Sequence, residues 1–203
     1  MTLADCLTVS AIDPARLAEI HTSQRDERGN SLARLQAEGW EPLRCCLTFP
    51  SPGEEIALIS YSPFHTSSPW SETGPVYVHP TPCAGYRMSR ELPDRMRTGP
   101  KVLRTYRADG TLHYDHIMLV NEGVDLEDPI RNLLAVDEIA TVHVRAVHSQ
   151  CFGYSVRLSG ICGDAPDDRG GRLGGQLPPA TAGPEVGHAG VACLDGGAAK
   201  RPG

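Results

Sequence analysis

Aromatic residues mark the part of this 203-residue chain that can form a core: every Phe, Tyr and Trp lies between Trp40 and Tyr154. From Ser159 onward the chain is dense in Gly, Pro and Ala, with only scattered Leu, Val and Ile. Such a segment buries too little apolar surface to offset the entropy lost on ordering. We therefore predict one folded domain over residues 1–159 and a disordered tail over residues 160–203.

Short β-like runs dominate the predicted domain. Runs of apolar residues bounded by Pro, Gly and Asp predict strands at 44–49, 56–61, 75–79, 101–108, 111–120, 140–147 and 151–158. We expect 44–49 to pair with 56–61, and the runs that flank Asp109-Gly110 to form a second hairpin. The chain has no alternating βαβ pattern and no repeat, so the predicted fold is α+β with a mainly antiparallel sheet.

Two or three short helices are expected beside this sheet. In "SAIDPARLAEIH", Asp13 is a good N-cap, Pro14 suits the first helical position, and Leu17 with Ile20 forms an apolar stripe. The acidic start and apolar side of "DLEDPIRNLLAVD" predict a helix at 125–137. The polar stretch 24–41 is expected to extend the first helix or to form an exposed one around 31–38, and 91–99 to hold a helical turn or two.

Charge and hydropathy exclude several classes of partner. The net charge is −6, Lys101 is the only Lys of the predicted domain, and no basic run occurs, so no nucleic acid partner is expected. No apolar stretch reaches the roughly 20 residues of a membrane span, and the N-terminus lacks a signal-peptide pattern. Seven cysteines without framework spacing are typical of reduced thiols. We expect a cytoplasmic protein, and the sequence leaves its oligomeric state open.

Alternation along the predicted strands places polar side chains on shared faces. In "TVHVR", Val142 and Val144 take one face, which leaves His143 and Arg145 on the other. The same counting groups Tyr77 with His79, Arg104 with Tyr106, and Arg44 with Cys46. A solvated sheet face is polar in any case, but it more often carries Thr, Lys, Glu and Ser. Because Arg binds carboxylates and phosphates and His transfers protons near neutral pH, this face predicts a site for a small anionic molecule.

The stretch "GPVYVHPTPC" raises a second possibility, a metal site. His79 and Cys83 are ligand types that zinc accepts, and further ligands are available from Cys45, Cys46, Cys151, His143 and His148. No CxxC or HExxH motif supports such a site, and the prolines beside Thr81 stiffen the loop without any metal. We therefore expect no cofactor, with zinc held by His79, Cys83, His143 and Cys151 as the alternative.

A reactive thiol is a third possibility. Cys45, Cys83 or Cys151 beside a His or Arg would have a lowered pKa and could act as a nucleophile or in redox chemistry. Free Cys is, however, commonly a small buried apolar residue. No GxGxxG, Walker or GxSxG motif occurs. The Glu54-Glu55 pair lies at a turn, where solvated carboxylates are expected.

The order of four segments resembles a bacterial family, domain of unknown function 1203. These segments are "CLTFPSPGEEIALISYSPF", "GPVYVHPTPC", "LRTYRADG" and "VHVRAVHSQCFGY". The resemblance covers about residues 43–158 and implies a small cytosolic protein of one domain, with no established activity. It implies recurring positions at Cys45 or Cys46, Pro52, Gly53, Glu54, Tyr61, Gly74, Pro75, His79, Cys83, Arg104, Tyr106, His143 and Cys151.

Three hypotheses of function follow. In the first, Arg104 and Arg145, with Arg44 as a further contributor, bind the anionic group of a small molecule that Tyr106 orients, and His79 and His143 act as acid and base. In the second, Cys83, Cys151, His79 and His143 bind zinc or form a thiol redox site. In the third, the chain is an interaction protein whose tail acts as a tether. The sequence leaves turnover open.

Overall fold

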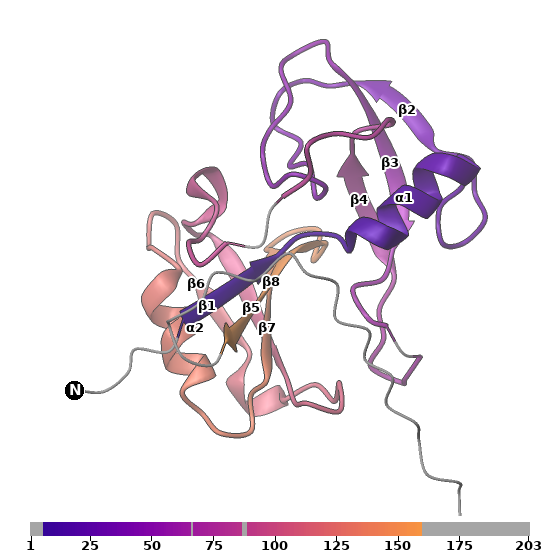
Figure 1. Ribbon diagram of the computed structural model, residues 1–203. Helices are drawn as coiled ribbons and strands as arrows, with labels where there is room; N and C mark the ends of the chain where they lie inside the picture. Colours follow the sequence, from indigo (N-terminus) through magenta and orange to yellow (C-terminus); the bar gives the residue numbers. More distant parts are fainter. Residues whose placement is uncertain (1–5, 66, 87–88, 160–203) are drawn as a thin grey trace, which may run out of the picture. The chain divides into compact units, whose positions relative to one another are not determined.

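The computed structural model describes residues 6–65, 67–86 and 89–159 (Figure 1). The elements are, in chain order, β1 (Cys6–Ser10), α1 (Pro14–Ser23), β2 (Ala33–Gln36), β3 (Glu55–Tyr61), β4 (Gly74–Val78), β5 (Lys101–Tyr106), β6 (Met118–Val120), α2 (Glu127–Leu134), β7 (Thr141–Ala146) and β8 (Phe152–Ser159). Short 3-10 helices occur at Asp94–Met96 and Tyr114–His116. The tail predicted at 160–203 lies outside the described residues.

The strands form two sheets. A five-stranded sheet has the order β1-β8-β7-β5-β6, and a three-stranded sheet has the order β2-β3-β4. All neighbouring strands in both sheets are antiparallel. With α1 and α2, this arrangement confirms the predicted α+β class with mainly antiparallel sheets. None of the described helices is long and apolar enough to cross a membrane.

Both α-helices form where the sequence predicts them. The Asp13 carboxylate accepts hydrogen bonds from the backbone N–H groups of Ala15 (2.8 Å) and Arg16 (3.4 Å), which caps α1. The helix ends before Gln24, whose φ of 54° is left-handed. It does not extend into 24–41 as the sequence analysis allowed. Helix α2 is shorter than predicted and buries Ile130, Leu133 and Leu134 beside the five-stranded sheet.

Two groups of buried apolar side chains form the interior. The first lies between α2 and one face of the five-stranded sheet and includes Leu103, Val142, Val144 and Tyr154. The second joins α1 to the three-stranded sheet and includes Phe152 of β8, which belongs to the five-stranded sheet. Residues of β8 therefore contribute to both groups.

Two predicted elements are wrong in type. Residues 44–47 form a turn rather than a strand, because Leu47 takes a φ of 54° and its N–H donates to the Leu43 carbonyl (2.9 Å). The predicted hairpin of 44–49 with 56–61 is therefore absent, and β3 pairs with β2 and β4. The region 31–38 holds β2 rather than a helix. It is an edge strand with mostly exposed side chains, Arg34 among them, and its backbone pairs with β3.

Other differences concern the ends of the five-stranded sheet. The Asp109-Gly110 turn forms, with Gly110 at φ 84°, but the returning chain makes a 3-10 turn before the short strand β6. Strand β1 was not predicted, and it pairs with β8 along its whole length. Cys6 in β1 is disulfide-bonded, which differs from the expectation of reduced cysteines throughout, whereas Cys45, Cys46, Cys83 and Cys151 are free.

Candidate functional site

Four of the predicted site residues lie on one face of the five-stranded sheet. Arg104 of β5 is directly opposite His143 of β7, and Tyr106 and Arg145 follow on the same face. The rings of Tyr106 and His143 have centroids 4.5 Å apart. Val142 and Val144 point to the opposite face, into the apolar group beside α2.

The two arginines of this face already bind a carboxylate of the chain. Glu72, in the loop before β4, forms ion pairs with Arg104 and with Arg145 (2.7 Å). Arg145 also donates to the Gln150 carbonyl at 2.9 Å, yet its Nε and Nη2 are buried and have no hydrogen-bond partner among the described residues. The guanidinium groups of Arg104 and Arg145, which we predicted to bind an anionic ligand, therefore bind the Glu72 carboxylate of the chain itself.

Arg44 approaches the same region from the 44–47 turn rather than from a strand. Its Nε donates to the Phe152 carbonyl at 2.7 Å, and burial lowers the pKa of its guanidinium to about 10. Arg44, Lys101 and Arg145 line one small cavity of about 60 Å³. Such a volume admits a water molecule or two but no metabolite.

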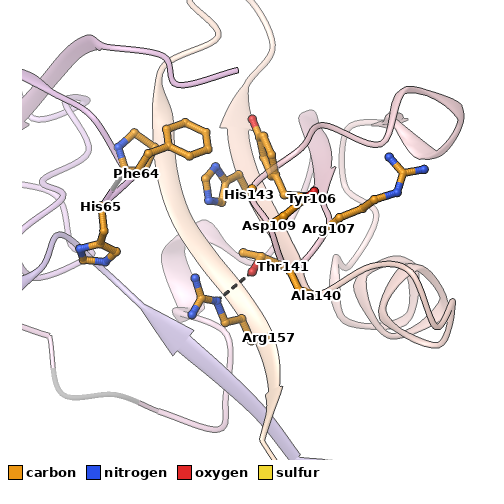
Figure 2. Close-up of a pocket in the computed structure, with 12 residues that line it drawn as sticks. Phe64, His65, Tyr106, Arg107, Asp109, Ala140, Thr141, His143 and Arg157 are labelled. Carbon is orange, nitrogen blue, oxygen red and sulfur yellow. Dashed lines mark hydrogen bonds between the residues drawn. The ribbon is translucent and has the colours of Figure 1, made fainter. Parts of the chain in front are cut away.

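A larger cavity adjoins Tyr106 and His143 (Figure 2). It has a volume of about 360 Å³ and lies between the sheet face and the loop that carries Phe64 and His65. The ring of Phe64 contacts both Tyr106 (5.2 Å between centroids) and His143 (5.4 Å). Arg157 of β8 also lines the cavity, and its Nε donates to Thr141 Oγ1 at 2.8 Å.

His143 is 4% exposed, and its Nδ1 has no hydrogen-bond partner among the described residues. Burial lowers the pKa of His143 well below its ordinary value, and the guanidinium groups of Arg145, Arg157 and Arg104 lower it further. The imidazole is therefore neutral at pH 7. Burial also raises the pKa of the Tyr106 hydroxyl, which is likewise buried without a hydrogen-bond partner among these residues.

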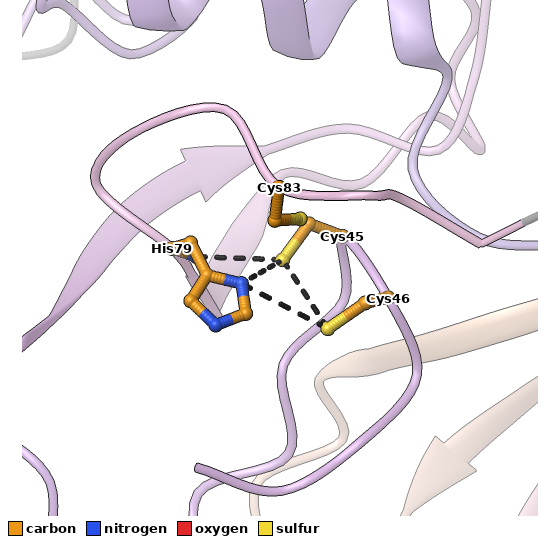
Figure 3. Close-up of side chains that lie close together, drawn as sticks. All are labelled: Cys45, Cys46, His79 and Cys83. Atoms are coloured by element: carbon orange, nitrogen blue, oxygen red, sulfur yellow. Dashed lines mark hydrogen bonds between the residues drawn. The ribbon is translucent and has the colours of Figure 1, made fainter. Parts of the chain in front are cut away.

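His79 and Cys83 lie in a separate place, with Cys45 and Cys46 (Figure 3). We call these four residues the Cys/His cluster. Its four ligand atoms, three sulfurs and one imidazole nitrogen, all lie within 4.8 Å of one another. His79 Nδ1 is 3.2 Å from Cys45 Sγ and 3.8 Å from Cys46 Sγ, and the latter two sulfurs are 3.8 Å apart.

Hydrogen bonds within and around the Cys/His cluster orient its groups. His79 Nε2 donates to Glu54 Oε1 at 2.9 Å, so Nδ1 faces the sulfurs. A hydrogen bond from the neighbouring Cys45 thiol lowers the pKa of Cys46. The same hydrogen bond, followed by burial, raises the pKa of Cys45.

The structure does not bring together all the residues grouped by the sequence analysis. His143 lines the cavity, whereas His79 belongs to the Cys/His cluster, so the two do not form an acid–base pair in one cavity. Cys151 is also apart from Cys83. Its Sγ lies 3.7 Å from the Ser149 carbonyl, in the turn before β8.

Four contributors were missed by sequence reasoning: Glu54, Phe64, Glu72 and Arg157. Glu54 was expected to be solvated, and its place among the positions implied by the family resemblance was the one available signal. Phe64 and Glu72 lie in a loop, where no periodicity indicates a direction. Arg157 lies on the same side of β8 as Ser155, so parity along that strand was the signal available for it.

The fold and these sites define the class: an α+β protein of two antiparallel sheets, with a cavity on one sheet face and a separate Cys/His cluster. The model of the family described as "Protein of unknown function (DUF1203)" matches residues 40–157, more than half of the chain. The chain belongs to this family. No curated protein and no solved structure matches it.

Proposed function

We propose that this protein binds a small organic anion in the cavity lined by Phe64, Tyr106, His143 and Arg157. One observation carries the proposal: two polar side chains of the cavity wall, His143 and Tyr106, are buried and have polar atoms without a partner among the described residues. Buried polar groups are almost always hydrogen-bonded, so we infer that a small movement of these two side chains offers the unpartnered atoms to a ligand in the adjoining cavity.

The charge around the cavity favours an anion, since Arg107 and Arg157 line it together with a single carboxylate, that of Asp109. Three guanidinium groups, of Arg104, Arg145 and Arg157, act on His143, and the Glu72 carboxylate compensates for the first two only in part. Arg157 is exposed and uses its Nε on Thr141, which leaves its two Nη groups for a carboxylate or phosphate. Arg104 and Arg145 do not line the cavity, but they add positive electrostatic potential to it from the same sheet face.

The size and lining limit the ligand further. A volume of about 360 Å³ is at the small end of the range for ligand pockets. Phe64 forms one wall, so the ligand carries a short apolar or flat part next to its anionic group. We further propose a bacterial, cytoplasmic protein, which the free thiols of Cys45, Cys46, Cys83 and Cys151 support, Cys6 being the exception.

Thermal shift with a panel of small anions tests the proposal. The panel holds phosphate, sulfate and small mono- and dicarboxylic acids, each measured on the wild type, on Arg157→Gln and on Arg34→Gln. Arg34 of β2 pairs with Glu55 of β3 and does not line the cavity, so this control loses the same charge elsewhere. At about 100 times its Kd, a ligand stabilises the fold by about 2.7 kcal/mol. We expect at least one anion to raise the Tm of wild type and Arg34→Gln but not of Arg157→Gln. Equal shifts in all three, or none in any, would contradict the proposal.

A further inference from the structure

Independently of the anion cavity, we propose that Cys45, Cys46, His79 and Cys83 form a zinc site, with Glu54 as the carboxylate that orients the histidine. Three thiolates and one imidazole are a ligand set of structural zinc sites. Neither Cys151 nor His143, two ligands of the alternative considered from the sequence, takes part. The four residues form the one group of this kind found among the described residues.

The distances within the Cys/His cluster fit tetrahedral coordination. Zinc bonds of about 2.3 Å to sulfur and 2.0–2.1 Å to nitrogen place two sulfurs about 3.8 Å apart and sulfur and nitrogen about 3.5 Å apart. The observed separations are 3.8 Å for the Cys45–Cys46 sulfurs, and 3.2 and 3.8 Å from these sulfurs to His79 Nδ1. These three atoms need shifts of only a few tenths of an ångström, and Cys83 Sγ, which lies within 4.8 Å of the others, needs a movement of at most about 1 Å to complete the coordination shell.

The backbone holds the ligands in place. The N–H of Arg44 donates to the Tyr77 carbonyl at 2.8 Å, which pins the 44–47 turn to β4. The His79 carbonyl lies 2.9 Å from His21 Nε2 of α1, so the residue after β4 is anchored from the helix side as well. Cys83 follows four residues later, after Pro80 and Pro82, which restrict the loop that returns it to the other three ligands.

A second observation concerns Glu54. A histidine that binds zinc through one nitrogen usually donates its other N–H to a carboxylate or carbonyl. His79 Nε2 makes this hydrogen bond to Glu54 Oε1 and leaves Nδ1 for the metal. Glu54 is itself held, since its Oε2 accepts a hydrogen bond from the N–H of Ser51 at 2.9 Å.

The site is of the closed, structural kind. Four protein ligands fill a tetrahedral shell and leave no position for a catalytic water. Bound zinc would connect the 44–47 turn, the end of β4 and the 80–83 loop, which are otherwise joined by a few hydrogen bonds. Leu43, just before this turn, and Leu47, its last residue, belong to different apolar groups, so the metal would stabilise the connection between these groups.

The first experiment measures metal in the full-length protein, purified under reducing conditions and dialysed against metal-free buffer. The variants are Cys83→Ser and the matched control Cys151→Ser, which removes a free thiol outside the Cys/His cluster. We expect about one zinc ion per chain in the wild type and in Cys151→Ser, and a loss of at least tenfold in Cys83→Ser. Wild-type protein that holds no zinc and binds none when it is supplied would overturn the proposal.

Cobalt substitution keeps the test decisive if Cys83→Ser fails to fold. Co²⁺ added to the metal-free wild type should produce the visible bands of a tetrahedral site and strong sulfur-to-metal charge transfer, and zinc should displace both. Thiols that form a reversible disulfide and give no Co²⁺ thiolate spectrum would instead establish a redox pair. That result would also contradict the zinc site.

Discussion

At the scale of single residues, two acidic side chains show how a carboxylate acts on the structure around it. Glu54 orients a histidine, whereas Asp26 binds backbone. The neighbour of Glu54 in the sequence, Glu55, pairs with Arg34 on the surface instead of with a histidine. Glu55 is therefore a control for Glu54.

Glu54→Gln should weaken zinc binding by about 10- to 100-fold, because the amide accepts the His79 hydrogen bond less strongly than a carboxylate. Competition with a chromophoric chelator measures the affinity. Glu55→Gln removes the same charge next door and should leave the affinity unchanged. Equal effects of both substitutions would show that only the overall charge matters.

Asp26 fixes the 24–32 loop to β3. Burial alone would raise the pKa of its carboxyl, but hydrogen bonds from the N–H of Ser60, the side chain and N–H of Asn30 and the N–H of Arg28 outweigh burial and lower it to about 2. Because the folded-state pKa lies below the ordinary 3.8, this contribution is complete above pH 4 and is lost as the pH falls toward 2. It amounts to about 2 kcal/mol.

Asp26→Asn should therefore lower the free energy of unfolding at pH 7 and flatten its decline between pH 4 and pH 2. Urea unfolding at several pH values measures both. Glu19→Gln, on the exposed side of α1, is the control. If the stability of Asp26→Asn declines between pH 4 and pH 2 as steeply as that of the wild type, a group other than Asp26 causes the decline.

At the scale of elements, the pairing of β7 with β8 positions Arg145 and Phe152. The register shifts between Val144 and Arg145, and Gly153 lies opposite this irregularity. A Cβ on Gly153 would be 2.7 Å from the Val144 carbonyl oxygen, closer than real contacts allow. Glycine is therefore required here for a close backbone approach.

Gly153→Ala should destabilise the fold by about 1–3 kcal/mol, as overpacking in a core does. Gly74→Ala, at the start of β4, is the matched control, since its added Cβ meets nothing within 4 Å. Denaturant unfolding of both variants measures the difference. Equal free energies of unfolding for Gly153→Ala and Gly74→Ala would show that β8 accommodates the added Cβ without loss of stability.

The helices and the central strands are the elements that the sequence predicted correctly. Capping by Asp13 and the apolar stripe of 127–134 are local signals, and both helices formed. Alternation was reliable on β5 and β7, which are paired along their length. It failed at 44–49, where the apolar residues indicated a strand. Leu47 is left-handed in a turn whose Arg44 N–H donates to the Tyr77 carbonyl of β4, a long-range contact that the local sequence does not indicate.

At the scale of the whole molecule, the sequence did not predict which distant segments lie next to one another. Strand parity indicated the shared face of Arg104, Tyr106, His143 and Arg145, but not the Glu72 carboxylate that binds its two arginines. The ligand types of His79 and Cys83 were recognisable, but their partners depend on the 44–47 turn. The sequence thus indicated which side chains can bind anions or metals. It did not indicate which of them lie together, because loops and turns determine that.

Histidine NMR tests whether an anion binds in the cavity beside His143. A pH titration of the His143 imidazole is recorded alone and with saturating amounts of the anion that gives the largest thermal shift, or phosphate if none does. The guanidinium groups of Arg104, Arg145 and Arg157 face this imidazole, and Glu72 neutralises part of their charge. We predict a pKa below 6.5 in the free protein and a higher pKa with the anion, because a nearby negative charge favours the protonated ring. A His143 titration that no anion alters would contradict anion binding in this cavity.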